Sequence, residues 1–248
     1  MNKTKRACLF CGKSNAMSNE HVLPQWLLEA MGIRKDKFKM VHSYFNVEIS
    51  KRQHNLENLV NGNVCVICNN GWMSRLESEV KNILLDMVYL NNIGFINKIN
   101  TDDVIRNKLA KWCYKTAIVL NNASNYRNLV PIEHFRNFFS GKSIPHNITI
   151  HMGLCEKQDV TWIQSQPSFI STVDVEGCKD SIASSYKINM EIGHFLFKVI
   201  YFPKKHYVEP QKTVIELYPN YCLHEKTSEQ DIIYKDILSF DFETINVI

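Results

Sequence analysis

Two Cys-x-x-Cys pairs constrain this chain more strongly than any other feature of its sequence. They are Cys8 with Cys11 and Cys65 with Cys68, and Gly12 directly follows the first pair. Two thiolates on one tight turn can reach the same tetrahedral ion, and two such turns supply the four sulfur ligands of a structural zinc site. We therefore expect one structural Zn²⁺ bound by all four thiolates, which ties the first turn to the second across the intervening chain.

The other four cysteines are isolated in the sequence. Isolated cysteines in a reducing compartment usually behave as small buried hydrophobic residues. We expect these four to be reduced and unligated: Cys113, Cys155, Cys178 and Cys222. No run approaches the roughly 18 apolar residues of a membrane span, and the basic N-terminus lacks the apolar core of a signal peptide. A cytoplasmic protein without a membrane partner is expected.

Positive charge is concentrated in the first third of the chain. Residues 1–85 hold 12 lysines and arginines against 7 aspartates and glutamates, whereas residues 86–248 hold 17 against 18. A polyanion such as nucleic acid is therefore expected to bind the N-terminal part, if it binds at all. Four thiolates and one Zn²⁺ add a charge of −2, which lowers the N-terminal balance from +5 to about +3. A basic surface that is merely solvated explains this charge equally well.

Hydrophobic periodicity predicts an α+β fold of two units. Residues 1–85 are expected to form the zinc-bound unit, and residues 86–248 a domain of unknown role in which a helical layer precedes an antiparallel sheet. Pro24 and Gly32 are typical of the start and end of a short helix, and Asp102 is typical of a helix cap. Helices are predicted over residues 24–31, 72–90, 102–121 and 131–140. Strands are predicted within residues 41–49, 146–152, 186–190, 193–201 and 213–218.

Three short motifs follow one another in the N-terminal third: CLFC, EHVLP and CVICN. Zinc bound to both cysteine pairs would bring an acid, a histidine and an amide, Glu20, His21 and Asn69, to one edge of a rigid unit. This order resembles the zinc-bearing branch of the HNH endonucleases, the ββα-metal nucleases, and the resemblance implies a treble-clef-like ββα unit. The longer segments EHVLPQWL, CNNGWMSRLE and LAKWCYKTAIV are similar to uncharacterised bacterial HNH proteins that carry an additional C-terminal domain.

The resemblance implies a role for each of these three residues. Glu20 and Asn69 would bind a catalytic divalent cation, Mg²⁺ or Mn²⁺, through the oxygen ligands that hard cations prefer. His21 would be the general base that takes a proton from the attacking water, a task suited to a side chain that titrates near neutral pH. The implied function is an HNH endonuclease that hydrolyses phosphodiester bonds, with DNA as the expected substrate.

Two residue assignments stay open in the sequence. Members of the family often have an asparagine five residues before the second cysteine pair, where this chain has Val60. The nearby alternatives are Asn58, Asn61 and Asn63. Glu77, on the helix after the second pair, could touch the site, but a surface salt bridge is the expected role.

Two other classes of function compete with the nuclease. A catalytically inactive, zinc-bound nucleic-acid-binding module would keep the scaffold without the chemistry, whereas intact Glu20, His21 and Asn69 favour the enzyme. An interaction protein that uses the zinc unit purely as a scaffold leaves the basic bias of residues 1–85 unexplained. Because no catalytic constellation follows residue 121, the C-terminal domain is expected to recognise DNA, sense a ligand, or bind a partner protein or a second copy of the chain.

Overall fold

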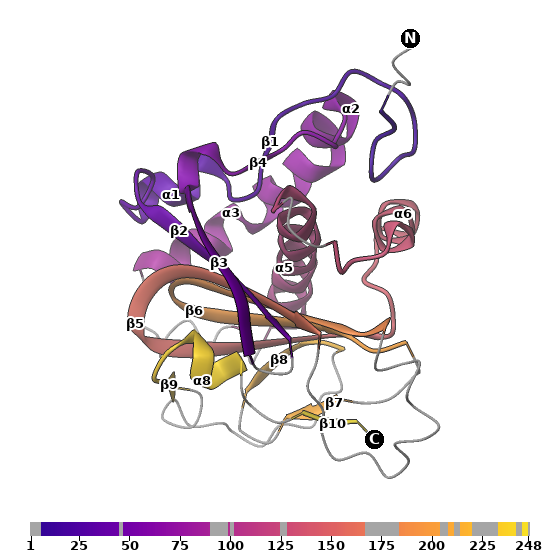
Figure 1. The fold of residues 1–248 in the computed structure, drawn as a ribbon. Coiled ribbons are helices and arrows are strands. Elements are labelled where there is room, and N and C mark those ends of the chain that lie inside the picture. The colour runs from indigo at the N-terminus through magenta and orange to yellow at the C-terminus, as the bar shows by residue number, and fades with distance from the viewer. Residues whose placement is uncertain are drawn as a thin grey trace.

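A curved mixed sheet with helices on both of its faces forms the body of the computed structural model (Figure 1). The structure describes residues 6–44, 47–89, 99, 102–124, 128–166, 184–203, 208–210, 214–219, 233–241 and 245–247. The sheet has six strands: β2 (Lys37–Tyr44), β3 (Val47–Asn55), β5 (Ile148–Gln166), β6 (Tyr186–Tyr201), β8 (Ile215–Tyr218) and β9 (Ile233–Tyr234). Its main order is β3-β2-β5-β6, and β8 and β9 also pair with β5.

The helices and two small sheets complete the described elements. The helices are α1 (Gln25–Ala30), α2 (Val66–Cys68), α3 (Ser74–Tyr89), α5 (Asp103–Ala123), α6 (Ile132–Gly141) and α8 (Ile237–Asp241), with a 3₁₀ turn η1 (Leu56–Asn58) and a π-helical turn η2 (Asn69–Met73). The small sheets pair β1 (Glu20–His21) with β4 (Val60–Asn61) and β7 (Val208–Pro210) with β10 (Ile245–Val247). Each of the four predicted helices is present within two residues of its predicted ends, and the α+β class is confirmed.

Three details of the predicted strands are wrong. The single strand predicted within residues 41–49 is an antiparallel pair, β2 and β3. The two strands predicted on either side of Gly193 form one strand, β6, because Gly193 adopts a φ of +64° opposite a register shift in β5 and lets the strand continue. The sheet is mixed rather than antiparallel, because β2 and β9 both run parallel to β5.

Strand β6 is buried on both faces, although apolar and polar residues alternate along its first half. Successive side chains of a strand point to opposite faces. Phe195 and Phe197 accordingly join the larger core, where the ring of Phe197 lies 6.2 Å from that of Trp112 in α5. Leu196 joins a second core with Phe240 of α8. Figure 1 shows α5 above β6 and α8 below it.

The N-terminal and C-terminal parts share one sheet and one core. β2 pairs with β5 from Lys39 opposite Thr161 to Tyr44 opposite Gln166. The predicted boundary after residue 85 lies inside α3. The larger core includes buried residues of α1, α3, α5 and β6. In the part of the chain that the structure describes, no helix combines the length and apolar character required to cross a bilayer.

Candidate metal centre and neighbouring strand pair

The four cysteines of the two pairs form a compact cluster. Their Sγ atoms all lie within 4.8 Å of one another, although Cys8 and Cys11 are far in sequence from Cys65 and Cys68. The Sγ atoms of Cys11 and Cys65 are 3.7 Å apart, which is much longer than a disulfide bond. Tetrahedral ligands at the usual Zn–S distance are about 3.8 Å from one another. The cluster therefore has the donor set and the spacing of a structural zinc site.

Backbone geometry at both turns fits metal binding. The N–H of Gly12 donates to the carbonyl of Cys8 at 3.0 Å, with Gly12 at a φ of +75°, and the N–H of Asn69 donates to the carbonyl of Cys65 at 3.0 Å. The N–H of Cys65 also donates to the Sγ of Cys8 at 3.4 Å. Such N–H···S contacts stabilise negative charge on sulfur, the form in which cysteine binds metal.

The hydrogen bonds around Cys65 favour its thiolate. Burial raises the pKa of this thiol, but the backbone N–H of Cys68 and the side chain of Asn15 outweigh that effect and lower it to about 7. Burial raises the pKa of the Cys8 thiol. A bound zinc ion would deprotonate such a thiol outright.

Of the isolated cysteines that the structure describes, neither Cys113 nor Cys155 joins this cluster. Both are buried, and neither forms a disulfide with a described residue. Cys178 and Cys222 lie outside the described residues.

A short antiparallel pair of strands, β1 with β4, leads into the cluster, and β1 carries the predicted acid and base. Glu20 pairs with Asn61, and His21 pairs with Val60, in antiparallel register. Four residues after Asn61 the chain reaches Cys65, and α3 follows. Helix α1 and strands β2 and β3 lie between β1 and β4 in the chain, so the β1–β4 pair joins two segments that are far apart in the sequence (Figure 1).

His21 is available for chemistry. Its side chain is half-buried, and its ring makes no hydrogen bond to a described residue. A general base has to reach a water molecule or a substrate, so partial exposure and an unengaged ring suit that task.

Glu20 is buried and bound to a lysine from outside the N-terminal third. The Nζ of Lys115, at the centre of α5, lies 3.4 Å from Oε1 of Glu20 and 2.9 Å from Oε1 of Glu77. Lys115 is fully buried and Glu20 is 4% exposed. The surface salt bridge expected for Glu77 is thus an ion pair with a buried ammonium, and it brings Glu77 to the site.

Burial and the neighbouring charges shift the pKa values of Glu20 and Lys115 in opposite directions. Burial raises the pKa of Glu20, and the ammonium of Lys115 opposes this effect without cancelling it. Burial alone would lower the pKa of Lys115, but the carboxylates of Glu77 and Glu20 reverse the shift and raise it. The ammonium is therefore charged in the folded protein at neutral pH. Sequence reasoning missed Lys115, because it shares a helix face with Lys108 and Lys111 and therefore resembles a solvated lysine.

Of the three asparagines left open by the sequence, Asn61 is the buried one. Its Nδ2 donates to the carbonyl of Val119 at 3.0 Å and to Oδ1 of Asn122 at 3.1 Å, and its Oδ1 accepts from the N–H of Asn63 at 2.9 Å. Asn58 is exposed in η1. Asn61 therefore links β4 to α5, and its side chain makes no hydrogen bond to His21.

Asn69 begins the π-helical turn that follows the second cysteine pair. It is half-buried, and its side chain makes no hydrogen bond to a described residue. Hydrogen bonds among the described residues link Glu20 to Lys115 and Glu77, and they do not link it to Asn69. The structure thus brings Glu77 to Glu20 and leaves the side chain of Asn69 without such a link.

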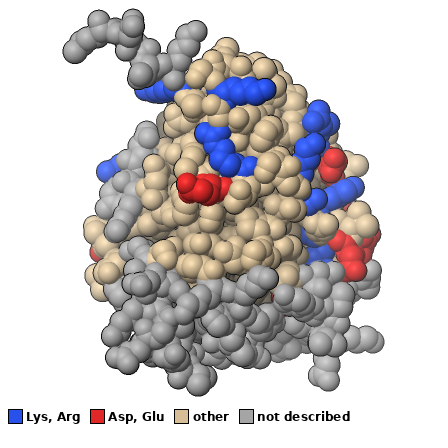
Figure 2. Space-filling view, turned by 90° about the vertical axis from the view of Figure 1, so that its right-hand side faces the viewer, with Lys and Arg blue, Asp and Glu red and all other residues tan. Residues whose placement is uncertain are grey.

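Basic side chains are prominent on one face of the molecule. Figure 2 shows blue lysine and arginine side chains across its upper part, at the height where Figure 1 places α2 and the N-terminal segment. Arg6, Lys13 and Arg75 are exposed basic residues of this N-terminal part. A phosphate backbone would be attracted to such a surface.

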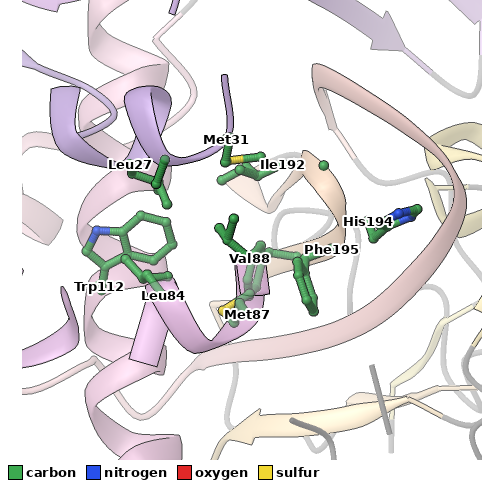
Figure 3. A pocket seen from close by; sticks show the side chains of 12 residues that line it. Leu27, Met31, Leu84, Met87, Val88, Trp112, Ile192, His194 and Phe195 are labelled. Atoms are coloured by element: carbon green, nitrogen blue, oxygen red, sulfur yellow. The ribbon is translucent and has the colours of Figure 1, made fainter. Parts of the chain in front are cut away.

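An apolar cavity of about 220 Å³ lies apart from strands β1 and β4. It is lined by α1, α3, α5 and β6, and Figure 3 shows Leu27, Leu84 and Trp112 on one side of it and His194 at the other. The Nδ1 of His194 lies 3.0 Å from the carbonyl oxygen of Cys155, so the lining offers few polar groups to orient a ligand. Neither Glu20 nor His21 lines this cavity.

Together these features combine a four-thiol metal site, a half-exposed histidine and a buried carboxylate on one small unit. A carboxylate and an amide can hold a hard cation, and a histidine can move a proton. Comparison of the chain with protein-family models, curated proteins and solved structures finds no match.

Proposed function

We propose that this protein is a divalent-metal-dependent endonuclease of the HNH type that hydrolyses phosphodiester bonds in DNA. One juxtaposition carries the proposal: strand β1, with Glu20 and His21, pairs directly with β4, the strand that leads into the second cysteine pair. The structural Zn²⁺ would hold both segments in place. The exposed basic side chains of the N-terminal part support binding to a polyanion.

In this proposal His21 is the general base. Its ring is partly exposed and free of hydrogen bonds to described residues, so it can accept a proton from a water molecule aligned with the phosphorus atom. The water oxygen then attacks the phosphodiester, and the 3′ oxygen departs. The products carry 5′-phosphate and 3′-hydroxyl ends.

Glu20 and Asn69 are the proposed ligands of Mg²⁺ or Mn²⁺. Lys115 holds Oε1 of Glu20, while Oε2 makes no hydrogen bond to a described residue and is left for a cation. The amide oxygen of Asn69 has no such partner either, and both donors are of the type that hard cations prefer. A bound divalent cation would shield the phosphate charge and stabilise the departing oxygen.

A second candidate is a catalytically inactive nucleic-acid-binding module. One observation favours it, namely that Lys115 already supplies a positive charge to Glu20. In such a module the ammonium would replace the catalytic cation, and the zinc-bound scaffold would serve binding alone. The two candidates differ in whether a divalent cation binds and whether DNA is cut.

The test is incubation of the purified, zinc-loaded protein with supercoiled plasmid, single-stranded DNA and RNA, in Mg²⁺, Mn²⁺ or EDTA. The nuclease proposal expects nicked or linear plasmid with Mg²⁺ or Mn²⁺ and intact plasmid with EDTA. Binding of plasmid without cleavage in every metal would instead support the inactive module.

A further inference from the structure

We propose that Glu77 is a positioning residue that neutralises Lys115 and so leaves Glu20 able to bind the divalent cation. This inference rests on the proposed function, because it concerns the same cation. It assigns a role to a residue of α3 that the sequence places only in a surface salt bridge.

The distances around the ammonium are unequal. The Nζ of Lys115 is 2.9 Å from Glu77 but 3.4 Å from Glu20. The ammonium therefore forms its closer ion pair with Glu77, which holds it back from Glu20. Without that carboxylate, Glu20 would be the remaining ion-pair partner of Lys115 among the described residues, and the ammonium would move onto it.

The net charge around Lys115 also indicates that Glu77 favours cation binding. Two carboxylates around one ammonium have a net charge of −1, which attracts a cation. Glu77→Gln would reduce that net charge to zero and leave Glu20 as the partner of both the Lys115 ammonium and the cation. Lys115 is fully buried and Glu77 is 21% exposed, so solvent screens the repulsion between the ammonium and the cation poorly.

The expected consequence is weaker cation binding with an intact scaffold. Glu77→Gln keeps the shape of the side chain and leaves the pair of Glu20 with Lys115 in place. We expect the dissociation constant for Mn²⁺ to rise by about tenfold or more. DNA cleavage at saturating Mn²⁺ should return to near the wild-type rate, because Glu77 acts on the binding of the cation and not on proton transfer.

The experiment measures Mn²⁺ binding to the full-length, zinc-loaded protein by electron paramagnetic resonance of free Mn²⁺, with zinc content and melting recorded for every variant. Glu79→Gln is the matched control, because Glu79 lies two residues further along the same helix and is exposed. A second variant, Lys115→Met/Glu77→Gln, removes the ammonium that would otherwise pair with Glu20. It should recover at least the wild-type affinity.

The outcomes separate this inference from the proposed function. Tenfold weaker Mn²⁺ binding in Glu77→Gln, unchanged binding in Glu79→Gln and recovery in the double variant support the role of Glu77. Wild-type affinity in Glu77→Gln overturns it while the nuclease proposal stands. An equal loss in the single and double variants overturns it as well, since it would indicate a structural role. If the double variant does not fold, the comparison of Mn²⁺ binding between Glu77→Gln and Glu79→Gln decides whether Glu77 has this role. Wild-type protein that binds no Mn²⁺ at this site overturns both.

Discussion

Replacing Cys65 and Cys68 together with serine is expected to remove the zinc ion and destabilise the protein. Both thiols are buried, and both lie in the four-sulfur cluster. We expect one zinc ion per chain in the wild type and none in the variant. The reason is that two remaining thiolates do not complete a tetrahedral structural site.

The size of the loss follows from the loop that the metal closes. The two pairs are 54 residues apart from Cys11 to Cys65. A cross-link over that distance lowers the entropy of the unfolded chain, which raises the free energy of unfolding by about 4 kcal/mol at 25 °C. For a chain of this length, each kcal/mol corresponds to about 2–4 °C in Tm, so the melting temperature should fall by about 8–16 °C.

Metal analysis and thermal unfolding of the purified proteins check this prediction. Cys113→Ala is the matched control, because Cys113 is an equally buried thiol outside the cluster. It should keep one zinc ion per chain. A serine variant that melts with the wild type, or wild-type protein without zinc, would refute the reasoning.

Two further predictions concern acid stability and metal rescue. Burial between Tyr114 and Tyr186 lowers the pKa of His134 from 6.5 to about 4, so between these pH values the unfolded chain binds a proton that the folded protein does not. Stability should therefore fall by about 3 kcal/mol as the pH drops through this window, and denaturant unfolding of His134→Gln at pH 7 and pH 4 should show a smaller fall. Glu20→Ala and Asn69→Ala should lose plasmid cleavage and regain part of it at high Mn²⁺, and failure of both to respond to added metal would contradict their assignment as ligands.

Features with a local cause could be predicted from the sequence. Cysteine spacing alone predicts which four sulfur atoms meet, because each pair lies on its own tight turn. Asp102 caps α5 by accepting from the N–H groups of Val104 and Ile105, and this signal lies within one helical turn. Alternation over residues 186–190 and the β-forming residues of 193–201 also predict strand structure, although Gly193 wrongly suggests a break within β6.

Features that depend on distant partners could not be predicted. The parallel pairing of β2 with β5 joins Lys39 to Thr161, and nothing in either segment specifies the other. Lys115 is a similar case, because its partners Glu20 and Glu77 come from a strand and a helix far away in the sequence. The burial of Asn61 depends on α5 in the same way, so sequence spacing alone could not separate it from its neighbours.

Removal of the proposed general base tests the nuclease proposal most directly. Plasmid cleavage by the wild type, His21→Ala and His54→Ala is measured across a titration of Mg²⁺ and Mn²⁺, with zinc content and DNA binding recorded for each protein. His54 is an exposed histidine of β3 and serves as the matched control. We expect His21→Ala to lose about 10²–10⁴-fold in rate at every metal concentration, with zinc and DNA binding unchanged, and His54→Ala to cleave like the wild type. Cleavage by His21→Ala at the wild-type rate would contradict the assignment of this site as a nuclease centre.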